Sequence, residues 1–123
     1  MTALWHGDAH TVLEINLPAV KTLFIYLVIV LAPLAGTILL WTRYYSVGIA
    51  VVTISMASSL AFGVYHHYIL ISPDNIAHLP AGLPAAQAQF INSAALIALF
   101  ELVSALVGAY ALLRFREPNS SLS

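Results

Sequence analysis

Three long apolar stretches dominate the pattern of hydrophobic and polar positions along this chain. They cover 22–42, 44–65 and 87–113, and the only formal charge within them, apart from Arg43 between the first two, is Glu101. A helix rises about 1.5 Å per residue and the hydrocarbon core of a bilayer is about 30 Å thick, so roughly 20 apolar residues cross it. Because a backbone in lipid must form its hydrogen bonds within the segment, each stretch is predicted to be a helix.

The residues between these stretches predict how the helices are connected. Residues 41–45 are too few for anything but a tight turn, so the first two helices are expected to be antiparallel neighbours. Residues 71–86 contain three prolines and a glycine, which predicts a loop instead of a fourth span. We therefore expect an all-α integral membrane protein with three transmembrane helices at about 19–42, 44–70 and 86–113, an N-terminal segment 1–17 that can form a short interfacial helix, and a tail 114–123.

Composition narrows the classes of protein that fit this pattern. Of the 123 residues, 61% are hydrophobic and 7% are charged, and the net charge is -1. Soluble domains carry about 25% charged residues, so this is not an ordinary soluble enzyme, and it lacks the basic surface of a nucleic-acid binder. The absence of cysteine excludes disulfides and thiolate metal sites. No nucleotide-binding, serine-hydrolase or zinc-protease motif is found, which argues against a catalytic role.

The few basic residues predict an orientation in the membrane. Arg43, Arg114 and Arg116 lie on the side of the first turn and the C-terminus, whereas Lys21 alone lies on the side of the N-terminus. Cytoplasmic loops carry the excess of Lys and Arg, so we expect a multi-pass protein with an extracytoplasmic N-terminus and a cytoplasmic C-terminus.

All five histidines fall on the predicted extracytoplasmic side. His6 and His10 are four residues apart and would share one face of a helix. Because imidazole and carboxylate groups bind transition metals, this side is a candidate site for copper, zinc or haem. Adjacent His66 and His67 point about 100° apart on a helix, so at most one of them faces a given partner. The candidate ligands are His6, His10, His66, His67, Asp74 and His78. The alternative is that these histidines only anchor the helices at the lipid headgroups.

Glu101 lies near the middle of the third apolar stretch. An acidic residue there costs roughly 2.5–3.5 kcal/mol on insertion scales, so it is expected to face the bundle interior. It lies on a polar and small stripe that also contains Gln89, Ser93, Ile97, Ser104 and Gly108. It is either part of a proton or cation relay, a ligand to a buried cofactor, or a partner in an interhelical hydrogen bond. Three helices are expected to be too few to surround it, which favours self-assembly.

Small residues predict where the helices pack closely. In the second helix Ser55, Ser59 and Gly63 recur every four residues, and the third helix carries Ser104 and Gly108 on one face. Such residues let helix backbones approach each other in membranes.

The layout resembles that of the copper-importer family, with three spans and potential metal ligands outside the membrane at the N-terminus. That resemblance implies metal uptake by a trimer. The paired methionines of that family's second span are absent, since Met56 stands alone in this helix, so the resemblance stops at the layout.

These observations favour a small polytopic membrane protein that acts as a non-catalytic subunit or assembly partner, as a homo-oligomer or within a larger membrane complex. One alternative is a metal- or haem-binding protein that uses an extracytoplasmic histidine cluster. Another is an oligomeric proton- or cation-coupled transporter around Glu101. Histidines that converge to within about 5 Å would favour metal binding, given metal–nitrogen bonds of about 2.0–2.1 Å. Exposure of Glu101 to lipid would favour assembly.

Overall fold

The structure of this protein is a computed structural model that describes residues 2–115. The expected tail therefore lies outside the described residues from position 116 onward. Within the described part, all regular secondary structure is helical. The elements in chain order are α1 (Thr2–Val12), α2 (Ala19–Phe24), η1 (Ile25–Leu31), α3 (Ala32–Leu40), α4 (Tyr45–Val64), η2 (Tyr65–Ile69) and α5 (Pro84–Phe115), where η marks a π-helix.

Three continuous helices are long and apolar enough to cross a membrane. They are Ala19–Leu40, built from α2, η1 and α3; Tyr45–Ile69, built from α4 and η2; and Pro84–Arg114 within α5. Their number agrees with the three apolar stretches of the sequence. The third helix starts slightly earlier than expected because proline, with its fixed φ and missing N–H, fits the first turn of a helix.

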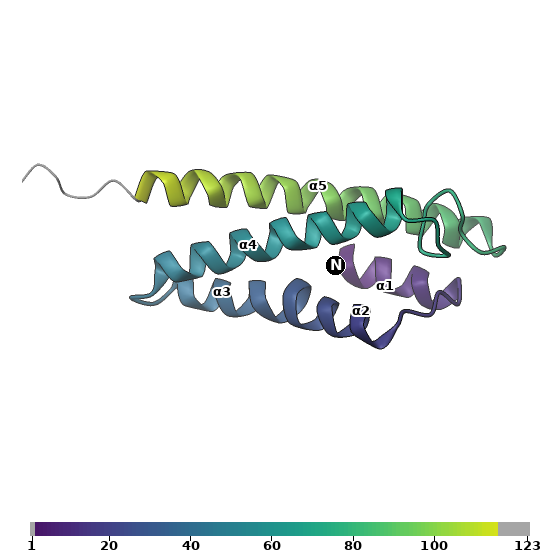
Figure 1. The fold of residues 1–123 in the computed structure, drawn as a ribbon, viewed down its shortest axis with the longest axis horizontal. Coiled ribbons are helices and arrows are strands. Elements are labelled where there is room, and N and C mark those ends of the chain that lie inside the picture. The colour runs from purple at the N-terminus through teal and green to yellow at the C-terminus, as the bar shows by residue number, and fades with distance from the viewer. Residues whose placement is uncertain (1, 116–123) are drawn as a thin grey trace, which may run out of the picture.

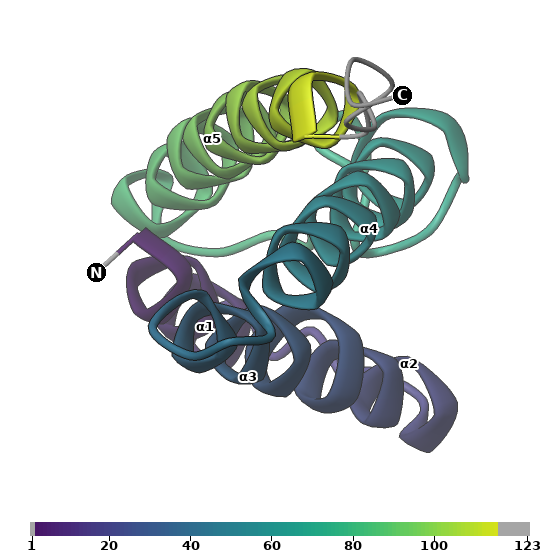
Figure 2. The same ribbon diagram turned by 90° about the vertical axis from the view of Figure 1, so that its left-hand side faces the viewer.

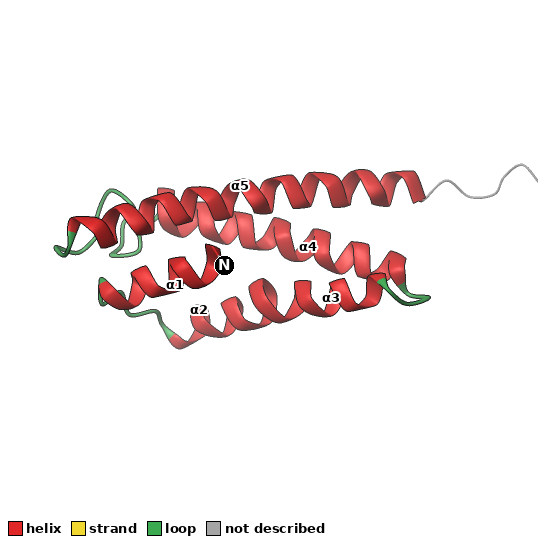
Figure 3. Cartoon of the chain, turned by 180° about the vertical axis from the view of Figure 1, so that it is seen from behind, coloured by secondary structure: helices red, strands yellow, loops and turns green. Residues whose placement is uncertain are grey.

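Each long helix runs antiparallel to the next one along the chain, and α4 lies between the other two (Figures 1 and 2). The turn 41–44 closes one end of the bundle. The loop 70–83, the start of α5 and the short helix α1 meet at the other end, where α1 lies along the first turns of α5 (Figure 3). The buried apolar cluster joins these segments and consists of Ala9, Leu13, Ile15, Ala86 and Phe90.

Helices α3 and α4 approach each other at two glycines. A Cβ atom on Gly48 would lie 2.7 Å from the carbonyl oxygen of Gly36 and 2.9 Å from the amide nitrogen of Leu40. Both distances are far below van der Waals contact, so the two backbones touch here only because side chains are absent. Gly108 of α5 is packed in the same way, since a Cβ atom there would collide with the side chain of Thr53.

The π-helix η1 lies just before Pro33, and a side chain of α4 supplies the hydrogen-bond donor that the proline lacks. In a π-helix each N–H bonds to the carbonyl five residues earlier, as the N–H of Ala32 does to Leu27. The carbonyl of Val28 would need the N–H of residue 33, but Pro33 has none. The hydroxyl of Ser55 donates to the Val28 carbonyl oxygen instead, at 2.5 Å. Ser55, predicted as a packing position, thus replaces a missing backbone donor.

We expect Ser55→Ala to lower the free energy of unfolding by about 1 kcal/mol, because the buried Val28 carbonyl loses its donor. The loss should be smaller in a Pro33→Ala background, where residue 33 regains an N–H. Reversible unfolding in detergent micelles measures both values, with Ser104→Ala as the control serine. Equal losses in the two backgrounds would contradict this account.

The chain leaves α1 through a Schellman motif. The N–H of Glu14 donates to the carbonyl of Thr11 at 3.2 Å, and that of Ile15 donates to the carbonyl of His10 at 2.9 Å. Glu14 has a φ of 53°, a conformation that glycine adopts freely and other residues adopt at a cost. This turn returns Ile15 to the apolar cluster beside Ala9 and so holds α1 against α5.

Glu14→Gly is therefore expected to raise the free energy of unfolding by about 1 kcal/mol, since glycine has no Cβ to clash in the left-handed region. Glu14→Ala keeps the Cβ and should give no comparable gain. Thermal unfolding of the two variants side by side tests this, and equal stabilisation by both would show that the backbone conformation is not the cause.

Candidate metal centre

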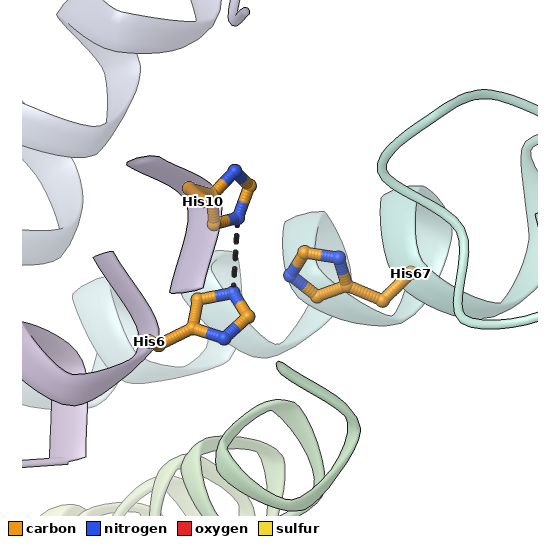
Figure 4. Close-up of side chains that lie close together, drawn as sticks. All are labelled: His6, His10 and His67. Carbon is orange, nitrogen blue, oxygen red and sulfur yellow. Dashed lines mark hydrogen bonds between the residues drawn. The ribbon is translucent and has the colours of Figure 1, made fainter. Parts of the chain in front are cut away.

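Three of the candidate histidines come together where α1 meets η2. His6 and His10 lie on one face of α1, as their spacing predicts, and His67 reaches them from η2 (Figure 4). One ring nitrogen from each histidine lies within 4.8 Å of the others. This convergence is the arrangement that the sequence analysis associates with metal binding.

The other two histidines lie outside this cluster. His66, next in sequence to His67, packs its ring against Phe62, with 4.3 Å between ring centroids. His78 places its Nδ1 atom 3.3 Å from the side-chain oxygen of Asn75 in the loop. Only one of the adjacent pair at 66 and 67 faces the cluster, which is what the 100° rotation per residue of a helix predicts.

A serine of α5 fixes the orientation of His6. The Nδ1 atom of His6 lies 2.9 Å from the hydroxyl oxygen of Ser93, and that hydroxyl donates its own hydrogen to the carbonyl of Gln89 at 2.7 Å. The His6 Nδ1 atom must therefore be the donor to Ser93. This tautomer makes the Nε2 atom of His6 an acceptor, and it receives a hydrogen bond from the Nε2–H group of His10 at 3.2 Å.

His67 is oriented by Asp74 from the loop 70–83. Its Nδ1 atom lies 2.9 Å from the backbone carbonyl oxygen of Asp74, which can only accept, so Nδ1 carries the hydrogen. The carboxylate of Asp74 lies 3.3 Å from the same nitrogen. The free nitrogen of His67 then points toward the pair formed by His6 and His10 (Figure 4). Metal-binding histidines are commonly oriented by a carboxylate or carbonyl in this way.

Asp74 also connects the cluster to α1 and α2. Its Oδ1 atom lies 3.4 Å from the Nε2 atom of His10 and accepts no hydrogen bond within the described structure, while its Oδ2 atom lies 3.9 Å from the ammonium group of Lys21. Burial by itself would raise the pKa of Asp74. The adjacent imidazole of His67, followed by His10 and the ammonium group of Lys21, outweighs burial and holds that pKa below its ordinary value. Asp74 is therefore a carboxylate at neutral pH.

The two histidines of α1 are neutral in this setting. Burial, reinforced by the neighbouring His10 and His67, lowers the pKa of His6 to about 3. Burial also lowers the pKa of His10, although the charge of Asp74 opposes this effect. Neutral imidazole is the form that binds metal ions, so these rings do not have to lose a proton before they bind one.

The spacing of two of the nitrogens matches the spacing of ligands around a single ion. Two ligands of a tetrahedral zinc ion with bonds of 2.0–2.1 Å lie about 3.3 Å apart. The 3.2 Å between the Nε2 atoms of His6 and His10 is close to that value. The ring centroid of His6 lies 4.8 Å from that of His10 and 5.0 Å from that of His67. These distances leave no space between the rings for a haem.

Glu101 lies between α4 and α5, deeper in the bundle than the histidines. It is 6% exposed, and the hydroxyl of Ser59 donates to its Oε1 atom. The expectation that one three-helix bundle cannot surround Glu101 is therefore wrong: α4 and α5 are close enough at this level to enclose it. Of the predicted packing positions, Ser59 and Gly63 face Glu101, whereas Ser104 is half-buried.

Two residues of the site have roles that the sequence analysis did not assign. Ser93 was placed on the inward stripe of the third helix, but its bond to His6 depends on where α1 docks. Lys21 was used only to predict orientation, yet it pairs with Asp74. The pairing of Lys21 with Asp74 could have been suspected from the sequence, because Lys21 is the one basic residue on the side that holds all the histidines.

No protein-family model, curated protein or solved structure matches this chain. The chemistry of its own residues is therefore the basis for inferring what the site does.

Acidification of the metal-free protein should release α1 from the bundle. Because the folded protein lowers the pKa values of His6 and His10, the undocked segment binds more protons, and docking weakens as the pH falls below the ordinary histidine value of about 6.5. The charge of Asp74 opposes the effect at His10. In a Trp41→Phe variant Trp5 of α1 is the single tryptophan, and its fluorescence between pH 7 and 5 reports the release.

A His6→Gln variant removes one of the titrating groups and should move the midpoint of this transition to lower pH. Emission from Trp5 that stays constant over the range would show that protonation does not undock α1.

Proposed function

We propose that this protein crosses a membrane three times and binds a divalent transition-metal ion at the end of the bundle that carries α1. Three long apolar helices support the first part, together with the many large apolar side chains that they leave exposed. Lipid is the solvent in which such surfaces are stable. The distribution of Lys and Arg supports an extracytoplasmic position for the metal site.

One observation carries the metal-binding proposal. Three imidazoles from two separate helices converge to within 4.8 Å, and two of them are held by hydrogen bonds that turn the lone pair of the opposite ring nitrogen toward the cluster. Histidines that merely anchor helices at headgroups have no need to meet in the interior with their ring nitrogens facing one another. The side chains of His10 and His67 are only 14% and 13% exposed.

The donor set favours Zn²⁺ and similar divalent ions. Three imidazole nitrogens with a nearby carboxylate oxygen match the nitrogen and oxygen ligands of zinc sites with three histidines. Cu⁺ prefers thiolate and thioether ligands, and the described site contains neither. Asp74 would complete the coordination or orient His67, and its negative charge offsets part of the charge of the ion.

A route to the site exists on the outer surface. A cavity of about 390 Å³ lies beside the C-terminal half of α1, lined by His10, Thr11, Glu14, Ile15 and Asn16. The proposed site is therefore buried but not sealed.

The role of an assembly partner has less support than metal binding. Its main argument was a carboxyl group that the chain leaves unshielded, and Glu101 is enclosed by α4 and α5. Gly36, Gly48 and Gly108 pack within the chain, so they are not available for contacts with another subunit.

The purified protein in lipid nanodiscs is expected to bind one Zn²⁺ or Co²⁺ per chain. His67→Gln should weaken binding on the order of 100-fold or more by removing a ligand, and Asp74→Asn by about 10- to 100-fold by removing its orienting partner. His78→Gln is the matched control, because His78 lies outside the cluster, and it should leave the affinity unchanged. Isothermal titration with Zn²⁺ and the absorption spectrum of the Co²⁺ form give stoichiometry, affinity and geometry.

Absence of stoichiometric metal in the wild-type protein would end the proposal. So would equal losses of affinity in His67→Gln and His78→Gln.

A further inference from the structure

The polar groups of the histidine cluster continue inward along one face of α4. His67, Gly63 and Ser59 follow one another at intervals of four residues, and Glu101 of α5 lies opposite them. A Cβ atom on Gly63 would lie 3.9 Å from the Cδ2 atom of His67 and 4.0 Å from the Oε2 atom of Glu101. The missing side chain at Gly63 thus leaves a gap between the imidazole and the carboxyl group, which we call the Gly63 gap.

Glu101 has no cationic partner among the described residues. Ser59, which is 1% exposed, donates to its Oε1 atom, and its Oε2 atom is turned toward the Gly63 gap. The basic residue nearest this end of the bundle, Lys21, pairs with Asp74 instead. A carboxylate at this depth is costly without a positive partner, and such residues in membrane helices mark ion pathways.

We propose that Glu101 and Ser59, together with His67, form an inner station for the divalent ion that the histidine cluster binds. The ion moves inward by exchanging His6 and His10 for the two oxygen ligands, while His67 stays bound throughout. One ion is shared by the two stations, so no repulsion between two ions opposes the transfer. This inference rests on the proposed metal-binding function and assigns it a direction, from the outer surface toward the middle of the bundle.

The helices close the path on the far side of the inner station. From His67 to Ser59 is eight residues of helix, or about 12 Å. Beyond Ser59 the backbones of α3 and α4 touch at Gly36 and Gly48, and Gly108 is packed on Thr53. In a single chain the ion at the inner station is therefore accessible only from the end of the bundle that carries α1. Passage to the other end requires these helices to separate.

Infrared difference spectroscopy of the full chain in nanodiscs, recorded on addition of Zn²⁺, tests the inner station directly. The wild type should show a change in the carboxylate stretching bands that is lost in Glu101→Gln. Asp8→Asn removes an exposed carboxylate that lies outside both stations and serves as the matched control, so its difference spectrum should keep that change. Gly63→Val fills the gap without removing a ligand and should abolish the same band, while the Zn²⁺ affinity of the histidine cluster stays within a few-fold of wild type.

A second measurement isolates the inner station from the outer one. His6→Gln combined with His10→Gln should still bind one Co²⁺ per chain, about 10- to 100-fold more weakly than wild type, with a spectrum richer in oxygen ligands. Adding Glu101→Gln should remove that residual binding. Circular dichroism checks that each variant keeps its helices, and the wild-type infrared spectrum does not depend on whether the combined variants fold.

The outcomes separate the two claims. If wild type binds one Zn²⁺ but Glu101→Gln and Asp8→Asn give the same infrared difference spectrum, the inner station is wrong and the outer metal site stands. Equal Co²⁺ binding with and without Glu101 in the double-histidine variant leads to the same conclusion. If the wild type binds no stoichiometric metal, the outer site is wrong and the inner station falls with it.

Discussion

Buried polar groups that have no water to bond determine where the helices of this protein contact one another. The Val28 carbonyl is satisfied by Ser55, the Glu101 carboxyl group by Ser59, and the ring of His67 by Asp74. The first two bonds join residues 27 and 42 positions apart, and the third ties the loop 70–83 back to the helix η2 that precedes it. Since an unmade bond in a low-dielectric interior is more costly than a lost apolar contact, these few pairs specify the arrangement of helices whose apolar surfaces are otherwise interchangeable.

The candidate metal centre shows how far this constraint reaches. Its groups come from α1, α2, η2, the loop 70–83 and α5, so the site exists only when all of these segments are docked. An ion bound there would add its binding free energy to the docking of α1. The same geometry would make this end of the protein sensitive to the supply of metal, because α1 contributes two of the three imidazoles and is held otherwise by a small apolar cluster and by hydrogen bonds from Gln89.

In the proposed transfer of a metal ion, Glu101 and the histidine cluster are parts of one polar path. Gly63 lies between them, and its missing side chain is what allows the imidazole of His67 and the carboxyl group to share a space. Ser59 and Gly63 were predicted as packing positions because small residues in membrane helices usually serve that purpose. The positions that do bring backbones into contact are Gly36 and Gly48, while Gly108 makes room for the side chain of Thr53. Small size alone does not distinguish the two uses.

The number of long helices and the turn at 41–44 can be predicted from the sequence alone. The same is true of the face shared by His6 and His10, and of the statement that at most one of His66 and His67 can face them. These follow from local quantities, namely run length, helical rise and the 100° rotation per residue. The tertiary structure decided that His67 is the one, that Asp74 orients it, that His78 stays outside, and that Glu101 is enclosed. Those outcomes depend on how α1 and the loop 70–83 fold back onto α4 and α5. The residues that make these contacts belong to different segments of the chain, so the local sequence pattern does not reveal them.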